Sequence, residues 1–212
     1  MIIALSAVIL AYLLGSINFA VIFSKLLKHN DIRESGSGNA GTTNVMRVNG
    51  FLPGALTFIF DALKGFAACE IGLVIFEEYV TGDATSIWSL PYAGAYFCAV
   101  ACIIGHIFPL FFKFRGGKGV ATCVGIFSVC CPVAIIAGLV VFTVVTVVSR
   151  YVSLGSLVAT VVVITLATVF RNAETPAVIQ IICCVIMATL IYYKHIGNIK
   201  RLIKGTENRI GR

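Results

Sequence analysis

The chain has 212 residues, of which 59% are hydrophobic and only 12% are charged, and it carries a formal net charge of +7. Soluble globular domains average about 45–50% apolar and about 25% charged residues. The composition therefore excludes a soluble protein and predicts a single polytopic membrane domain over residues 1–212. It does not indicate nucleic-acid binding, because the basic residues lie in short loops and a tail between apolar runs, where membrane topology and anionic lipid explain them.

The eight cysteines lie within or beside the apolar runs. They form neither a CxxC pair nor a Cys/His cluster with the spacing of a zinc site. We therefore expect them to be small packing residues, and we expect no metal site.

The apolar runs are read as membrane spans, each of which needs roughly 20 residues. Residues 2–27 lack a basic n-region and a cleavage site, so we expect a retained helix rather than a signal peptide. Further spans are predicted over residues 51–76, 90–112, 152–170 and 176–193. The run from 120 to 149 is too long for one ordinary span, and Pro132 is expected to divide it into two short helices of about 11–17 residues.

The loop charges decide between six and seven spans. With seven spans and an outside N-terminus, one face carries most of the basic residues: Lys25, Lys28, Arg33, Arg47, Lys113, Arg115, Lys118, Arg150, Lys194, Lys200, Arg201, Lys204, Arg209 and Arg212. The other face then carries Arg171 with the acidic residues Glu77, Glu78, Asp83 and Glu174. The positive-inside rule therefore predicts an all-α protein with seven transmembrane helices and a cytoplasmic C-terminus. Three polar motifs then share the cytoplasmic face.

The first motif is a glycine-rich loop over residues 36–44 with an arginine one turn further on. Glycine lets backbone N–H groups approach an anion, and a helix start favours negative charge. The loop offers neutral hydrogen-bonding groups from Ser37, Gly38, Asn39, Thr43 and Asn44, followed by the cation Arg47. An ordinary polar turn capped by Asn or Thr is the alternative explanation.

The second motif combines cations and glycines in Arg115, Gly116, Gly117, Lys118 and Gly119. Its spacing is not that of a nucleotide-binding P-loop. Three glycines in four positions nevertheless favour a phosphate site, with N–H groups freed by glycine, over a basic loop that contacts headgroups.

The third motif places His195, Asn198 and Arg201 on one helical face if the last helix continues, with Glu207 beyond Gly205. His195 is a proton acceptor, a hydrogen-bond donor to phosphate when charged, or an interfacial residue. Three further polar features stay open: Asp61 and Lys64, which can pair across one turn, and the isolated His106 and Glu70.

Taken in order, these motifs resemble the bacterial acyl-phosphate:glycerol-3-phosphate acyltransferases, the PlsY family. The resemblance also rests on Gly15-Ser16, Asp61-x-x-Lys64-Gly65, Gly105-His106 and Arg150-Tyr151-Val152-Ser153. It runs from residue 15 to residue 207. The sequence departs from the family pattern at Asn18, Thr42 and Arg115, where proline, alanine and lysine are usual.

The resemblance implies a multi-pass enzyme of the bacterial inner (plasma) membrane whose active site faces the cytoplasm. Its substrates would be acyl phosphate and glycerol 3-phosphate. It would acylate the 1-hydroxyl and give lysophosphatidic acid and phosphate, the first acylation of phospholipid synthesis. It would use no cofactor, no metal, no acyl-CoA and no acyl carrier protein, and membrane lipid would be its surroundings.

The resemblance also implies site roles. Ser37, Arg47, His195 and Asn198 are the expected catalytic residues, which position glycerol 3-phosphate. Expected to bind substrate or phosphate are Gly38, Asn39, Thr43, Asn44, Arg115, Gly116, Gly117, Lys118, Gly119, Arg150, Ser153 and Glu207. Either His195 or the substrate phosphate accepts the hydroxyl proton, and a covalent Ser37 intermediate stays open. A phosphate-ester transporter and a non-catalytic scaffold are the alternative functions.

Overall fold

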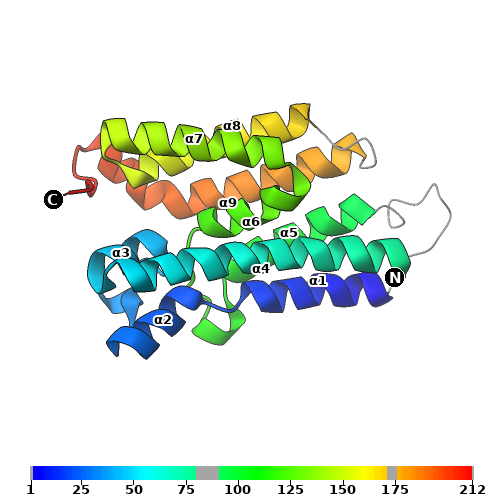
Figure 1. The fold of residues 1–212 in the computed structure, drawn as a ribbon, viewed down its shortest axis with the longest axis horizontal. Helices are drawn as coiled ribbons and strands as arrows, with labels where there is room; N and C mark the ends of the chain where they lie inside the picture. Colours follow the sequence, from blue (N-terminus) through cyan, green and yellow to red (C-terminus); the bar gives the residue numbers. More distant parts are fainter. Residues whose placement is uncertain (1, 80–90, 171–175, 212) are drawn as a thin grey trace.

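The computed structural model describes residues 2–79, 91–170 and 176–211. Over these ranges it is helical and has no strand. The elements are α1 (Ile2–Gly15), α2 (Phe19–Lys28), η1 (Ile32–Glu34), α3 (Thr42–Asn49), α4 (Phe51–Glu78), α5 (Pro91–Ile107), η3 (Leu110–Phe112), α6 (Val120–Cys130), α7 (Pro132–Ser149), α8 (Val152–Val169) and α9 (Ala177–Ile203). The long helices lie side by side in an elongated bundle, with α7 and α8 along one edge and α1 along the other (Figure 1).

Within the described residues, five helical segments are long and apolar enough to cross a membrane. They are Ile2–Lys28, Tyr92–Phe112, Pro132–Ser149, Val152–Val169 and Ala177–Ile203. Two more apolar helices are not among them: α4, which has 28 residues but carries Asp61, Lys64 and Glu70, and α6, which has 11 residues. The prediction of an all-helical membrane protein is confirmed. Of the charges used to predict its orientation, Asp83, Arg171, Glu174 and Arg212 lie outside the described residues.

Helix breaks fall where the local chemistry requires them. Pro132 begins α7, and Cys131 before it has an extended φ of −159°, because the residue before a proline is disfavoured in a helix. The break was predicted, but only α6 is short; α7 has 18 residues. The first apolar run is also divided, since Asn18 accepts a hydrogen bond from the Val21 N–H (3.2 Å) and caps the separate helix α2.

Small residues let the helices approach closely. A Cβ atom on Gly65 of α4 would collide with the Thr122 carbonyl of α6, and one on Gly125 of α6 would collide with the Ala62 carbonyl of α4. Close backbone packing of this kind is the usual basis of helix association in lipid. The eight cysteines, all within the described ranges, are buried and free, which confirms the expectation that they are packing residues.

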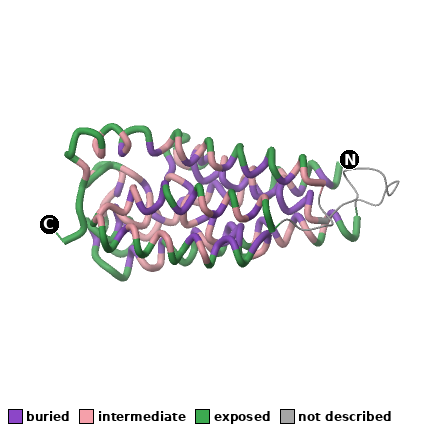
Figure 2. The backbone as a smooth tube through the Cα atoms, turned by 90° about the horizontal axis from the view of Figure 1, so that it is seen from above, coloured by how far each residue is buried: buried purple, intermediate pink, exposed green. Residues whose placement is uncertain are grey.

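The polar parts of the chain gather at one end of the bundle. Helix α3, the turn between α7 and α8, and the C-terminal tail lie there, and the N-terminus lies at the other end (Figure 1). Exposed positions follow the outer surface along the bundle and buried ones face inward (Figure 2). Helix α9 continues to Ile203, ten residues beyond the predicted span. His195, Asn198 and Arg201 of the third motif are therefore helical.

Candidate functional site

A cavity of about 780 Å³ lies at this polar end of the bundle, and we call it the main cavity. Its lining comes from the loop before α3, α3 itself, the first half of α4, the end of α5, the start of α6, the α7–α8 region, the end of α9 and the tail. An apolar pocket of about 80 Å³ shares Phe58, Val120, Phe142 and Ser156 with it. One end of this space is therefore polar and the other is hydrocarbon.

The first loop is held in place by one amide side chain. The Asn44 side chain accepts from the Ser37 N–H (2.9 Å), and its Nδ2 donates to the carbonyls of Ile32, Ser35 and Asn39 at 3.2, 2.9 and 3.1 Å. Asn44 is buried and these bonds occupy its amide. Asn44 was predicted to bind substrate, but its geometry gives it the task of shaping the loop. Ser37, Asn39 and Thr43 line the main cavity.

Gly116 and Gly117, the first two glycines of the second motif, let the loop pack closely against α5. Gly116 N–H donates to the Ile107 carbonyl (3.2 Å), and Gly117 N–H donates to the His106 carbonyl (3.1 Å). A Cβ atom on either residue would collide with α5 atoms, the His106 carbonyl for Gly116 and the His106 ring for Gly117. The expectation that these two N–H groups are free for an anion is therefore wrong.

The start of α6 provides the anion-binding geometry instead. Gly119 has a φ of 87° and precedes the first helical residue, Val120. The first N–H groups of a helix have no partner within it and carry partial positive charge. Gly119, Val120 and Ala121 line the main cavity beside Lys118. This end of α6 suits a phosphate group.

A chain of hydrogen bonds joins Lys118 to the tail. Lys118 Nζ donates to Asn198 Oδ1 (2.5 Å), and Asn198 Nδ2 donates to Glu207 Oε1 (2.6 Å). Glu207 also accepts from the Ser153 hydroxyl (2.8 Å) and from Arg201 Nε (2.7 Å). Glu207 was expected to bind substrate or phosphate, but a carboxylate repels phosphate, and here it joins α8, α9 and the tail.

Burial and bonding set the charge of this network. Burial lowers the pKa of Lys118 to about 8, so the ammonium is charged at neutral pH but loses its proton under mildly alkaline conditions. Burial alone would raise the pKa of Glu207, but the hydrogen bonds from Asn198, Ser153 and Arg201 outweigh it and the pKa is lowered. Lys118 is thus a cation and Glu207 an anion at neutral pH.

His195 lies on the same wall, buried on α9. Its Nδ1 is 2.8 Å from the Ile191 carbonyl oxygen, which can only accept a hydrogen bond. This contact assigns a proton to Nδ1 and, in the neutral ring, leaves the Nε2 lone pair to accept one. His195 lines the main cavity, so a reacting hydroxyl group in that cavity can meet this nitrogen.

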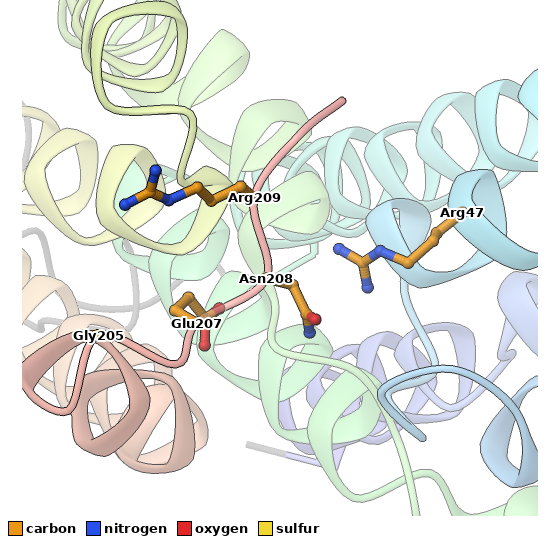
Figure 3. A pocket seen from close by; sticks show the side chains of 5 residues that line it. All are labelled: Arg47, Gly205, Glu207, Asn208 and Arg209. Atoms are coloured by element: carbon orange, nitrogen blue, oxygen red, sulfur yellow. The ribbon is translucent and has the colours of Figure 1, made fainter. Parts of the chain in front are cut away.

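Arg47 of α3 is a cation of the site whose side chain is not paired with a carboxylate in the described part of the chain. It lines both the main cavity and a neighbouring recess of about 300 Å³. Figure 3 shows its guanidinium group directed across the recess toward Asn208 of the tail. A free guanidinium at a recess is a forked donor for phosphate.

Lys64 and Asp61 form the pair that their spacing allowed. Their Nζ and Oδ1 atoms are 2.7 Å apart and both side chains are buried, and Lys64 also donates to the Ile17 carbonyl at 2.7 Å. His106 Nδ1 is 3.6 Å from the same Asp61 oxygen. Asp61 and His106 line the main cavity, whereas Lys64 lies behind them.

Most of the predicted site residues come together. The main cavity is lined by Ser37, Asn39, Thr43, Asn44, Arg47, Lys118, Gly119, Ser153, His195, Asn198 and Glu207. Gly38, Arg115, Gly116, Gly117 and Arg150 are not part of the lining. Arg115 and Arg150 are exposed on the surface.

Sequence reasoning missed the contribution of the tail beyond Glu207. Asn208 and Arg209 line both the main cavity and the recess. Their only signal in the sequence was that they follow the third motif directly.

The fold and the cavity define a membrane protein that can hold an amphiphilic anion, with cationic and hydrogen-bonding groups at one end of the cavity and apolar side chains at the other. Comparisons with known proteins agree with this class. The sequence model of the family "Glycerol-3-phosphate acyltransferase" matches residues 5–205. The glycerol-3-phosphate acyltransferase of Thermoanaerobacter sp. (strain X514) is 40% identical over 208 residues, which is 98% of this chain and 96% of that protein. The protein of the same name from Halalkalibacterium halodurans is 41% identical over 206 residues, 97% and 94% of the two chains.

Solved structures give the same result. The crystal structure of PlsY (YgiH), an integral membrane glycerol 3-phosphate acyltransferase, in its glycerol 3-phosphate form matches with a TM-score of 0.82 and 38% identity, over 98% of this chain and 96% of that one. Its lysophosphatidic acid form matches with a TM-score of 0.80 and 36% identity, over 98% and 95%. The chain belongs to the glycerol-3-phosphate acyltransferase family and is an integral membrane protein.

Proposed function

We propose that the protein transfers a fatty acyl group from acyl phosphate to the 1-hydroxyl of glycerol 3-phosphate. The products are lysophosphatidic acid and phosphate, in the first acylation of phospholipid synthesis. The observation that carries the proposal is the main cavity, where cationic groups for phosphate adjoin an apolar pocket for a chain. The relatives' names and the two solved forms, with glycerol 3-phosphate and lysophosphatidic acid, support the acceptor and the product.

The donor is assigned to the α6 side of the cavity. The start of α6 and Lys118 receive the phosphate of acyl phosphate, since free helical N–H groups and an ammonium lie together there. The acyl chain extends toward Phe58 and Phe142, where the apolar pocket continues between α4, α6, α7 and α8. An acyl chain removes apolar surface from water in this position.

The acceptor is assigned to the α3 side. Arg47 binds the phosphate of glycerol 3-phosphate at the recess, and Ser37 and Asn39 add neutral hydrogen bonds. His195 and Asn198 align the 1-hydroxyl from the opposite wall. Arg115 and Arg150 have no contact role in this arrangement, because neither lines the cavity.

The chemistry needs positioning and charge neutralisation. The hydroxyl oxygen attacks the acyl carbon, the bond from that carbon to the phosphate oxygen breaks, and phosphate leaves with the electron pair. The hydroxyl proton passes either to the leaving phosphate or to His195 Nε2. Fixed cations stabilise the charge that develops on phosphate, and orientation of two bound substrates replaces a bimolecular encounter.

The proposal includes seven spans, with the N-terminus outside and the cavity on the cytoplasmic side of the bacterial inner membrane. Together with α4 and α6, the five candidate spans make seven. The basic loops and tail around the cavity support a cytoplasmic location. Cysteine labelling of intact cells should find positions 28 and 204 accessible only after the membrane is opened, and position 78 accessible before.

Acyl transfer by the purified protein in nanodiscs tests the function. Palmitoyl phosphate and glycerol 3-phosphate should give lysophosphatidic acid, measured by mass spectrometry, while equimolar palmitoyl-CoA gives none. Glycerol in place of glycerol 3-phosphate is the matched control for the acceptor phosphate and should give little product. Comparable rates with palmitoyl-CoA would reject the assigned donor, and no product from either donor would reject acyl transfer.

A further inference from the structure

The C-terminal tail crosses the cavity because of the way α9 ends. Gly205 N–H donates to the Leu202 carbonyl (3.1 Å), Thr206 N–H donates to the Arg201 carbonyl (2.9 Å), and Gly205 has a φ of 69°. This is the Schellman pattern, which reverses the chain at a helix end and favours glycine at the left-handed position. The chain then turns back, and residues 207–211 line the main cavity. We call residues 208–211 the strap.

The strap is attached at both ends. At its start, the Glu207 carboxylate is bonded to Ser153, Asn198 and Arg201. At its far end, Ile210 N–H donates to the Arg150 carbonyl (2.9 Å), and Arg209 Nε donates to the Tyr151 hydroxyl (2.9 Å). The strap thus connects α9 to the turn between α7 and α8.

The two attachments differ in strength. The Glu207 side chain is only 5% exposed and accepts three side-chain hydrogen bonds. The Arg209–Tyr151 contact is exposed; the guanidinium carbon is 5.2 Å from the ring centroid. Exposed contacts of this kind are weak, and the only other bond described at this end is the one from the Ile210 N–H to the Arg150 carbonyl. The strap can therefore release from the Tyr151 side more readily than from Glu207.

The position of the strap relates it to the acceptor side of the cavity. Asn208 lies between Arg47 and Glu207, and the Arg209 side chain points away from Arg47 toward the α7–α8 turn (Figure 3). The recess of about 300 Å³ between Arg47 and the tail is the size of a small-molecule site. Release of the strap would open this recess to water and to larger molecules.

We propose that Arg209 and Tyr151 are positioning residues that hold the strap over the acceptor recess, exclude water from the donor and restrict the acceptor to a small phosphate ester. This inference rests on the proposed acyl transfer. Acyl phosphate reacts with oxygen nucleophiles in general. When water attacks the acyl carbon, the carbon–oxygen bond to phosphate breaks, phosphate leaves with the electron pair, and a fatty acid forms as water gives up its proton.

The ratio of fatty acid to lysophosphatidic acid formed by the protein in nanodiscs tests the inference. Fatty acid formed in matched nanodiscs without the protein is subtracted first; the corrected ratio then does not depend on how much of a variant is folded. Arg209→Ala should raise the ratio about two- to fivefold, the scale expected for loss of one weak exposed contact. It should also raise the KM for glycerol 3-phosphate and leave the KM for palmitoyl phosphate unchanged.

Three further variants sharpen the test. Tyr151→Phe keeps the ring but removes the hydroxyl that Arg209 contacts, and should raise the ratio by a smaller factor. Adding Tyr151→Phe to Arg209→Ala should change nothing more, because both remove the same contact. Lys204→Ala, which removes an exposed cation of the same tail outside the cavity lining, should match the wild type.

An unchanged ratio in Arg209→Ala would overturn the role of the strap. If that variant does not fold, an unchanged ratio in Tyr151→Phe would overturn it instead. An equal rise in Lys204→Ala would also contradict it, since the effect would then follow net charge. Failure of the wild type to form lysophosphatidic acid would reject the proposed function, a result distinct from all of these.

Discussion

Arg47 of α3 lines the main cavity, whereas Lys64 of α4 lies behind its wall, and the two cations differ in how they are bonded. Lys64 is 2% exposed and contacts the Asp61 carboxylate and the Ile17 carbonyl, both at 2.7 Å. Arg47 lines the cavity surface and forms no ion pair with any residue that the structure describes. A cation that is fully buried and paired with a carboxylate supports the fold, and one that faces the cavity with N–H donors to spare is available to a ligand.

The same contrast separates the two walls of the cavity. On the α9 wall, Lys118, Asn198 and Glu207 are joined in one chain of hydrogen bonds. On the α3 wall, Arg47 faces the recess and has no ion-pair partner among residues 2–79, 91–170 and 176–211. We therefore assign the α3 wall to recognition of the acceptor phosphate, and on the α9 wall we assign Glu207 to holding the cavity in shape.

Removal of the buried cation should produce the largest effect, and it should be an effect on stability. Lys64→Ala leaves the Asp61 carboxylate buried without its ion pair, which should cost about 3–5 kcal/mol. Thermal unfolding in detergent, followed by circular dichroism, measures the loss. The double variant Asp61→Asn/Lys64→Ala removes the stranded charge and should recover part of it; no recovery would mean that the ion pair is not the cause.

Removal of the free cation should affect activity alone. Arg47→Ala loses a charge-assisted contact to phosphate, and turnover should fall at least about tenfold and up to about 10³-fold. The melting temperature should stay at the wild-type value, because no described bond within the protein is lost. Lys200→Ala, which removes an exposed cation of α9 outside the cavity lining, is the matched control and should keep full activity.

Gly117→Ala tests the loop before α6, which contains neither Lys64 nor Arg47. Its new methyl group would collide with the His106 ring and approach the Ala40 carbonyl, so the loop before α6 must shift. We expect a KM for palmitoyl phosphate about tenfold higher, the scale of one weakened phosphate contact, with a smaller change in kcat. A change confined to the KM for glycerol 3-phosphate would place the donor phosphate elsewhere.

The smallest effect expected is a pH dependence from Lys118. Its pKa is about 8 because burial disfavours the ammonium, so rising pH through that value removes the charge that attracts phosphate. The kcat/KM for palmitoyl phosphate should therefore fall above about pH 8, since this parameter reports the free enzyme. In Lys118→Arg the decline should move to higher pH, because guanidinium stays charged; an identical profile would assign the titration to another group.

Much of the fold is predictable from the sequence because a membrane restricts the choices. Long apolar runs give helices, and Pro132 marks the break between α6 and α7. The division between α1 and α2 was not predicted, because Asn18 was seen as a departure from a family pattern and not as a helix cap. The length of α7 was underestimated, since the helix starts at the proline and keeps its full 18 residues.

The residues of the site were easier to find than their tasks. Composition and spacing indicated Arg47, Lys118, His195 and Asn198, and all four line the main cavity. The tasks of Asn44 and Glu207 depend on which atoms their side chains bond. The partners of Asn44 lie in η1 and the loop before α3, and those of Glu207 lie on α8 and α9. A motif shows that a polar group is present, but only the packed structure shows whether its bonds are already made.

Activity per folded molecule, measured side by side for Arg47→Ala and Lys64→Ala in nanodiscs, tests the central distinction most directly. Lysophosphatidic acid formed from palmitoyl phosphate and saturating glycerol 3-phosphate is divided by the amount of folded protein, determined by size exclusion. We predict that folded Arg47→Ala is at least about tenfold slower than the wild type, whereas the folded fraction of Lys64→Ala, although small, has a near-normal rate. A stable but inactive Lys64→Ala, or an Arg47→Ala with near-wild-type turnover, would contradict the account.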